Sequence, residues 1–179
     1  MNEYTGVVLL CEDRQQEIFA REFLIRCGIE KRRIYPDVCP KGKQAGEQFV
    51  REKYPRSVIS YRKKANHLSN ALVILTDADT LTVQARLQRL ANELQSHEIS
   101  PRLPEERIGL FIPKRNIETW IHFLAAGEAD EETIYRHLEK ESQCKPYVER
   151  LAQNRSQPLP ETAPASLKSA CHEITRILE

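Results

Sequence analysis

The sequence predicts an α/β protein with a Rossmann-like, mostly parallel sheet that is flanked by helices. Two observations favour this class. Short, uniformly apolar runs at 5–11 and 71–75 are typical of strands buried on both faces of a parallel sheet. Stretches with helical spacing of apolar residues alternate with them along the chain. The length of 179 residues suits one such domain with a helical C-terminal extension.

The expected order is strand, helix, strand, two helices, strand, helix, strand and helix, with right-handed crossovers. The strands are predicted at 5–11, 33–39, 71–75 and 107–112, and the helices at 15–26, 47–54, 56–67, 83–94 and 116–125. Pro55 separates the second and third helices, because proline lacks the N–H that a helix interior needs. Thr82 is the expected N-cap of the helix that follows the central strand.

We place a domain boundary after Gly127, so that 1–127 form the α/β domain and 128–179 the helical extension. Helices are expected at 131–141, 146–153 and 165–178, with the proline-rich link 157–164 before the last one. Between 128 and 149, seven acidic residues face three basic ones. This acidic surface is a candidate docking site for a partner protein.

The net charge of +1 gives no global indication of a nucleic-acid binder, but the charge is unevenly distributed. Between 31 and 64, eleven Lys or Arg residues face three acids, which favours contact with phosphates. The loop 40–46 carries Lys41 and Lys43 and lacks the spacing of a Walker A loop, so a nucleoside triphosphatase is excluded. We expect this basic loop to follow a nucleic-acid backbone. The neighbouring Tyr35, Tyr54 and Tyr61 either pack or stack on bases.

The five cysteines contain no Cys-x-x-Cys pair and are odd in number. A disulfide framework or a zinc ribbon is therefore not expected, and a reducing cytoplasm is. No apolar run approaches the roughly 20 residues of a membrane span. The first residues lack the basic-then-apolar order of a signal peptide. We expect a soluble, cytoplasmic protein that does not enter a membrane.

Acidic residues follow two of the expected strands. Asp77 and Asp79 come directly after 71–75, and Glu12 follows 5–11. The carboxyl ends of parallel strands meet at one edge, where ligands of α/β sheets bind. Carboxylates held this close repel each other unless a hard cation lies between them. We therefore predict a Mg²⁺ or Mn²⁺ site formed by Glu12, Asp77 and Asp79. The open alternatives are a solvated turn in which Asp79 or Thr80 caps a helix, and a surface role for Glu12.

An acidic residue after the first strand and Asp-x-Asp after the third resemble the arrangement of Toprim domains. These domains occur in topoisomerases, bacterial primases and nucleases of the overcoming-lysogenization-defect type. The segment 112–121, in which Glu118 and Trp120 open a helix, also resembles small Toprim-like proteins of prokaryotic anti-phage defence loci. The resemblance covers about residues 5–125. It departs from the Toprim pattern where Asp13 replaces the usual Gly, and where no third acid follows Asp79.

The resemblance implies a Toprim-type sheet and a Mg²⁺-dependent nuclease. Glu12 would correspond to the Toprim glutamate, as a ligand or general base, and Asp77 and Asp79 to its metal-binding pair. Glu118 would serve a second metal or orient the ligands. Lys114 would steady the phosphate. Phosphate contacts are expected from Arg14, Lys41, Lys43 and Arg115. The implied partners are nucleic acid, DNA included, and an ATPase of a defence system.

Two other functions stay open. One is a non-catalytic Toprim-like subunit that binds an ATPase or nucleic acid. The other is a phosphatase of the haloacid-dehalogenase type, whose motif Asp-x-Asp-x-Thr/Val follows the first strand; here Leu81 occupies the Thr/Val position and the pair follows the third strand. The histidines lack the HExxH spacing of a zinc site. His122, four residues after Glu118, is a candidate to face the site, and Trp120 is expected in the core.

Overall fold

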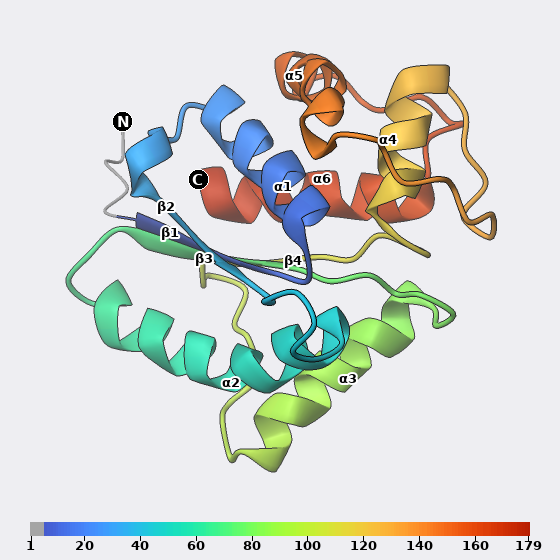
Figure 1. Cartoon of the computed structure of the whole chain (residues 1–179). Helices are drawn as coiled ribbons and strands as arrows, with labels where there is room; N and C mark the ends of the chain where they lie inside the picture. The colour runs from blue at the N-terminus through green and yellow to red at the C-terminus, as the bar shows by residue number, and fades with distance from the viewer. Residues whose placement is uncertain (1–5) are drawn as a thin grey trace.

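The fold is an α/β sandwich around a single four-stranded parallel sheet, as expected (Figure 1). The computed structural model describes residues 6–179, so Thr5 of the first expected strand lies outside the described residues. The strands are β1 (Gly6–Cys11), β2 (Ile34–Val38), β3 (Asn70–Leu75) and β4 (Ile108–Phe111). The helices are α1 (Arg14–Arg26), α2 (Gly46–Ala65), α3 (Val83–Ser96), α4 (Ile117–Ala126), α5 (Lys145–Gln153) and α6 (Ala165–Leu178), with 3₁₀ turns η1 (Lys31–Arg33) and η2 (Glu141–Cys144).

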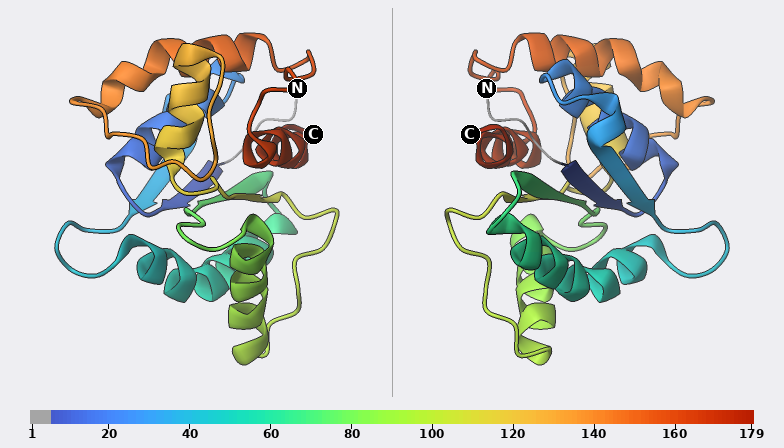
Figure 2. Two further views of the ribbon diagram at one scale, coloured as in Figure 1. Left: turned by 90° about the vertical axis from the view of Figure 1, so that its right-hand side faces the viewer. Right: turned by 90° about the vertical axis from the view of Figure 1, so that its left-hand side faces the viewer.

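Helices cover both faces of the sheet. In Figure 1, α1, α4, α5 and α6 lie above it, and α2 and α3 lie below it; the side views of Figure 2 show the same two layers. The alternation of side chains along β1 builds both cores. Val7, Leu9 and Cys11 pack into the upper core, whereas Leu10 packs into the lower one. The buried, uniformly apolar strands of the sequence therefore correspond to a sheet sandwiched between two layers.

The strand order β2-β1-β3-β4 places a topological switch between β1 and β3. The chain leaves β1 toward β2 on one side, and then crosses to β3 on the other side of β1. The connections after β1 and β3 therefore diverge to opposite faces of the sheet. At such a point a crevice opens beyond the carboxyl ends of the strands, and α/β proteins bind ligands there.

The region around Pro55 differs from the expectation of two short helices. One continuous helix, α2, runs from Gly46 to Ala65 with Pro55 inside it. Its buried side chains Val50, Tyr54 and Val58 repeat every four residues across the proline. A proline in a helix interior costs about 3 kcal/mol, and burial of this stripe against the sheet offsets that cost.

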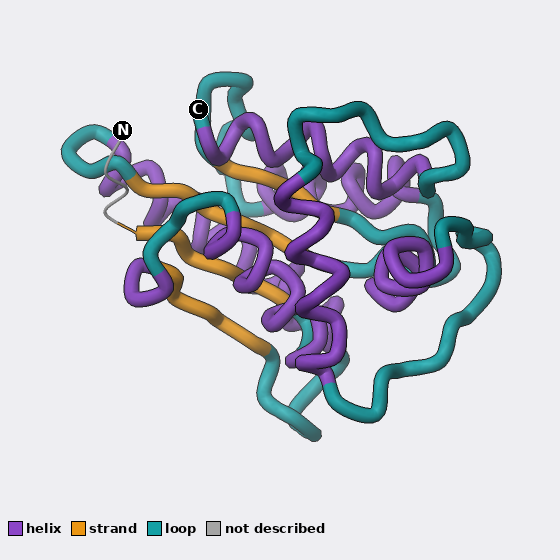
Figure 3. Tube along the Cα trace, turned by 90° about the horizontal axis from the view of Figure 1, so that it is seen from above, coloured by secondary structure: helices purple, strands orange, loops and turns teal. Residues whose placement is uncertain are grey.

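The expected helix at 131–141 is also wrong. This segment is irregular, and it leads into the 3₁₀ turn η2 (Figure 3). Few of its side chains are apolar, so a helix there would have little to bury. Polar contacts fix it instead: the Tyr135 hydroxyl accepts from the Asp130 N–H at 2.7 Å, and a Glu131 carboxylate oxygen accepts from the Ser166 N–H at 3.0 Å.

The other two expected C-terminal helices are confirmed as α5 and α6. Helix α6 lies on β4, and its buried residues Leu167, Ala170, Ile174 and Ile177 join the upper core. Helix α5 packs on α1 through Val148 and Leu151. The C-terminal segment thus completes the upper layer of the same sheet. None of the helices between residues 6 and 179 combines the length and the apolar character that a membrane span requires.

Candidate functional site

Glu12 and Asp77 meet at the switch point between β1 and β3. The parallel register pairs Cys11 with Leu75, which brings the next residues of both strands side by side. One carboxylate oxygen of Glu12 accepts hydrogen bonds from the Thr76 hydroxyl and from the Asp77 N–H, the latter at 2.8 Å. Glu12 is therefore held by the end of β3 rather than solvated as a free surface acid.

The two carboxyl groups share an unfavourable electrostatic environment. Burial raises the pKa of Glu12 to about 7, although the bonds from Thr76 and Asp77 work in the opposite direction. Burial also raises the pKa of Asp77 well above its usual range, and the charges of Glu12, Asp13, Glu118 and Asp79 raise it further. Burial therefore favours the protonated, neutral form of both carboxyl groups unless a nearby cation compensates for their negative charge.

Asp77 is 6 % exposed, and its Oδ1 has no hydrogen-bond partner within the described chain. A buried carboxylate oxygen without a donor costs free energy, so such atoms are rare in folded proteins. Where they occur, an ordered water, a bound ion, a catalytic role or local strain accounts for them. This unpaired oxygen is the most specific chemical feature at the edge of the sheet.

The start of α1 fixes the backbone around Glu12. The Asp13 side chain caps the helix by accepting from the Gln16 N–H at 2.9 Å, and the Gln16 side chain accepts from the Glu12 N–H, also at 2.9 Å. The Asp13 of the sequence, which departs from the Toprim pattern, therefore acts as an N-cap.

Gly46 allows the start of α2 to lie against Glu12. A Cβ at position 46 would be 2.6 Å from the Glu12 Cβ and 3.1 Å from the Glu12 carbonyl oxygen. No side chain fits there, so the glycine sets how closely α2 and its preceding basic loop approach the acidic edge. The sequence shows only a glycine at a helix start; the close approach of Gly46 to Glu12 becomes apparent in the fold.

Asp79 lies in a different environment from Asp77. Its side chain is 58 % exposed, and Oδ2 pairs with Nη2 of Arg86 at 3.2 Å. Arg86 itself is 3 % exposed and also pairs with Glu47 of α2 at 2.7 Å. Burial raises the pKa of Asp79, and the Arg86 charge opposes that shift. Arg86, which the sequence analysis missed, thus links α3, α2 and the loop after β3.

The loops after β3 and β4 are joined beyond the sheet. The Asp79 N–H donates to the Arg115 carbonyl at 3.0 Å, and both residues adopt the left-handed conformation, with φ of 54° and 67°. Lys114 Nζ donates to the Leu81 carbonyl at 3.0 Å. Strained backbone of this kind persists where the surrounding structure enforces it, and it is frequent at functional sites.

Some of the predicted phosphate-binding cations are bonded to other groups of the protein, and others are exposed. Arg14 pairs with Glu17, and Lys114 is committed to Leu81 and lies 3.4 Å from Glu132. The Arg115 side chain donates to the Glu132 carbonyl at 2.9 Å. These three cations stabilise the protein itself. Lys41 and Lys43 are exposed in the loop before α2, whose end contacts Glu12 through Gly46.

Glu118 is buried in the first turn of α4, and its charge acts on Asp77. Its carboxylate bonds the Nδ1 of His137, whose side chain is 80 % exposed. His137 lies in the irregular segment that was expected to be helical, so sequence reasoning missed it. His122 does not take this place: it is exposed and stacks on Tyr135, with ring centroids 4.1 Å apart.

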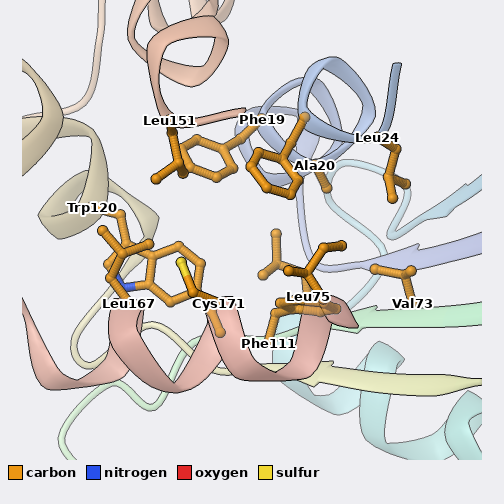
Figure 4. A pocket seen from close by; sticks show the side chains of 13 residues that line it. Phe19, Ala20, Leu24, Val73, Leu75, Phe111, Trp120, Leu151, Leu167 and Cys171 are labelled. Atoms are coloured by element: carbon orange, nitrogen blue, oxygen red, sulfur yellow. The ribbon is translucent and has the colours of Figure 1, made fainter. Parts of the chain in front are cut away.

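A separate apolar cavity of about 40 Å³ lies in the upper core, between α1, α6 and the sheet (Figure 4). Trp120 borders it, is 2 % exposed and donates through Nε1 to the Ser166 hydroxyl at 2.8 Å, as expected of a core residue. The lining carries no charged side chain, and apolar cavities of this kind stay dry. We interpret it as a packing gap.

The acidic edge fits an open cation site better than a closed one. Within residues 6–179, no three His, Cys, Asp or Glu side chains are arranged so that they could hold a metal ion as they stand. Mg²⁺, however, is usually bound by one or two carboxylates, with water and substrate phosphates as its other ligands. The unpaired oxygen of Asp77 and the neighbouring Glu12 meet that requirement.

In comparisons with known proteins, the chain matched no family model, no curated protein and no solved structure. The resemblance to Toprim domains therefore stays a prediction from the residues.

Proposed function

We propose that this protein is a Toprim-like, Mg²⁺-dependent nuclease, which hydrolyses phosphodiester bonds of nucleic acid. The observation that carries the proposal is the buried, unpaired Oδ1 of Asp77 beside Glu12 at the switch point of the sheet. Folding stability alone would favour an apolar or neutral residue at this position. A bound cation would offset the cost of burying the Asp77 carboxylate.

In this proposal Asp77 and Glu12 hold the cation, and Asp79 completes the acidic edge. A bound Mg²⁺ or Mn²⁺ supplies relief of charge at the phosphate and a water that ionises closer to neutral pH. Thr76 and the Asp77 N–H orient the Glu12 carboxylate through their hydrogen bonds. Lys41 and Lys43 offer charge to the phosphates next to the reacting one.

The alternative is a non-catalytic subunit of the same fold, and one observation favours it. Asp79 is neutralised by Arg86, and Lys114 and Arg115 are bound to neighbouring loops. A haloacid-dehalogenase phosphatase fits less well, since the Asp pair follows β3 rather than the first strand. A cytoplasmic defence role with an ATPase partner rests on the resemblance alone, with the acidic stretch 128–149 as a candidate docking surface.

The test is cleavage of supercoiled plasmid, linear DNA and RNA in Mg²⁺, in Mn²⁺ and in EDTA. We expect metal-dependent cleavage, and a loss of at least about 100-fold in Asp77→Asn, which exceeds the effect of most outer-sphere substitutions. Asp130→Asn, an exposed acid of the α4–α5 loop, is the matched control. Hydrolysis of p-nitrophenyl phosphate without nucleic-acid cleavage would favour the phosphatase.

Binding of the metal ion can be measured independently of cleavage, as a change in melting temperature. At pH 8, Mn²⁺ should raise the melting temperature of the wild type and leave that of Asp77→Asn unchanged, because a ligand stabilises only the state that binds it. Stabilisation without any turnover, together with a co-purifying protein, would support the non-catalytic subunit. No stabilisation in any divalent ion would contradict the metal site.

A further inference from the structure

A groove of about 630 Å³ lies in the lower layer, between the loop before α2, one side of α2 and the turn after α3. Its lining combines Lys43, Arg56 and His97 with the apolar side chains of Ile59 and Ile99. The groove begins close to the acidic edge. The same loop that supplies Lys43 to the groove ends at Gly46, against the backbone of Glu12.

Lys53 also lines the groove, but it pairs with Asp37 and lies over the Phe49 ring. Elsewhere in the basic stretch, Arg51 pairs with Glu47 and Glu93, and Arg62 with Glu106. Lys43 and Arg56 have no acidic partner in the part of the chain that the structure describes. Glu52 is the acid that lines the groove, and it accepts from Gln48 at 2.8 Å. The groove therefore combines two cations that have no acidic partner with apolar surface.

A second hollow of about 240 Å³ continues from Arg56 along α2 toward Lys64. It is bordered by Val8, whose register neighbour Tyr35 is 54 % exposed on the edge strand β2. Tyr54 and Tyr61 are buried, at 1 % and 8 %, so they pack rather than stack. Tyr35 lies beside the second hollow, outside its lining, with its ring against Gly6, and it is the tyrosine of the basic stretch that stays exposed.

We infer that these two hollows bind one strand of single-stranded nucleic acid, which runs from the acidic edge along α2. Lys43, Arg56 and Lys64 contact phosphates at intervals along the strand. Bases lie against Ile59 and Ile99, and one stacks on Tyr35. A duplex hides the faces of its bases in the stack, so they could not lie against the apolar side chains of the groove or stack on Tyr35. The combination of cations with apolar and aromatic surface therefore favours a single strand.

The test is fluorescence anisotropy of a labelled single-stranded oligonucleotide and of its duplex, measured in EDTA over a range of salt concentrations. We expect tighter binding of the single strand. Lys43→Ala and Arg56→Ala should each reduce the slope of log K against log salt by about 0.7, because each removes one phosphate contact. Tyr35→Ala should weaken binding about 10-fold through loss of stacking.

Lys140→Ala is the control, because Lys140 is exposed and directly precedes η2, which packs on α1 in the upper layer, on the other face of the sheet from α2. It should bind as the wild type does. Equal binding of duplex and single strand, or an equal loss in Lys140→Ala and Lys43→Ala, would overturn the inference. Melting curves confirm that each variant is folded.

The path of the strand toward Glu12 rests on the proposed function, whereas binding is measured without a metal ion. A protein that binds the single strand in EDTA and cleaves nothing in Mg²⁺ would support the groove and contradict the nuclease. A protein that cleaves nucleic acid, but whose binding of the single strand is unchanged by Lys43→Ala, Arg56→Ala and Tyr35→Ala, would support the nuclease and contradict the groove.

Discussion

Asp77 and Asp79 are two residues apart in the sequence but belong to opposite electrostatic environments. Asp77 is buried beside Glu12, and its Oδ1 lacks a donor. Asp79 is mostly exposed, and the buried Arg86 neutralises it. Asp77 thus has no positively charged partner among the described residues, whereas Arg86 supplies one to Asp79.

This difference separates two roles that the motif alone does not distinguish. The pair of Glu12 and Asp77 destabilises the fold when it is ionised, because burial disfavours the charged form of both groups. The pair of Asp79 and Arg86 ties α3 and α2 to the loop after β3, so it has a structural use of its own. Variants at the two pairs should therefore differ in pH dependence, in metal dependence and in stability.

The largest expected effect is a fall in stability with increasing pH. Glu12 has a raised pKa of about 7 in the folded protein, against 4.5 as a free group. Between these values the folded state binds more protons than the unfolded state, so the free energy of unfolding falls as pH rises. The shift corresponds to about 3 kcal/mol, fully present below pH 4.5 and lost by about pH 7. Urea unfolding at a series of pH values measures it.

Glu12→Gln should remove the part of this pH dependence that comes from Glu12 and leave the part that comes from Asp77, since the amide oxygen still accepts from Thr76 and from the Asp77 N–H but does not ionise. Mn²⁺ should restore stability at pH 8 and have little effect at pH 5, because protons and the cation compete for the same carboxylates. A free energy of unfolding that rises between pH 5 and 7, or that falls equally in Glu12→Gln, would contradict the assignment.

The second effect concerns Arg86. Arg86→Met keeps most of the buried volume but removes the charge between Glu47 and Asp79. Breaking a buried ion pair costs 3–5 kcal/mol when a buried charge is left behind. Here both carboxylates retain contact with water, so we expect a loss of about 2 kcal/mol in urea unfolding.

The control for Arg86→Met is Arg89→Met, an exposed arginine on the same helix, which should change stability by less than about 0.5 kcal/mol. The pH profile that depends on Glu12 should persist in Arg86→Met. If the pH dependence disappeared in Arg86→Met, the pair of Glu12 and Asp77 and the pair of Asp79 and Arg86 would not be independent.

Much of the fold was predictable because burial and chain order determine it. The apolar runs identified the strands, and helical spacing identified α1, α3, α4, α5 and α6. The same logic placed Glu12 and Asp77 at one edge, since their strands are parallel and adjacent. Thr82 caps α3 by accepting from the Ala85 N–H at 3.0 Å, as its position in the sequence indicated.

The errors came from tertiary contacts that local patterns do not contain. Pro55 ended a helix in the sequence analysis, whereas packing of α2 on the sheet carries the helix through it. Arg86 appeared as an ordinary helix residue, because its partners Glu47 and Asp79 lie on other elements. His137 reaches Glu118 only because residues 128–140 form a loop rather than a helix.

The smallest expected effect tests the contact that separates the acidic edge from the groove. Gly46→Ala should stabilise an isolated helix by about 1 kcal/mol. In the protein, the new Cβ meets the backbone and Cβ of Glu12, which cannot turn away as a flexible side-chain end would. Overpacking of this kind costs 1–3 kcal/mol. We therefore expect a net loss of about 1 kcal/mol, together with weaker Mn²⁺ stabilisation as Glu12 is displaced.

Gln48→Ala provides the comparison for Gly46→Ala, because Gln48 is exposed in the same first turn and its truncation removes only an exposed hydrogen bond to Glu52. Its stability should stay within about 0.5 kcal/mol of the wild type. A Gly46→Ala protein as stable as Gln48→Ala, with unchanged Mn²⁺ stabilisation, would show that α2 yields freely at this point. The position of Glu12 would then depend on its hydrogen bonds to Thr76 and Asp77, and not on the approach of the helix.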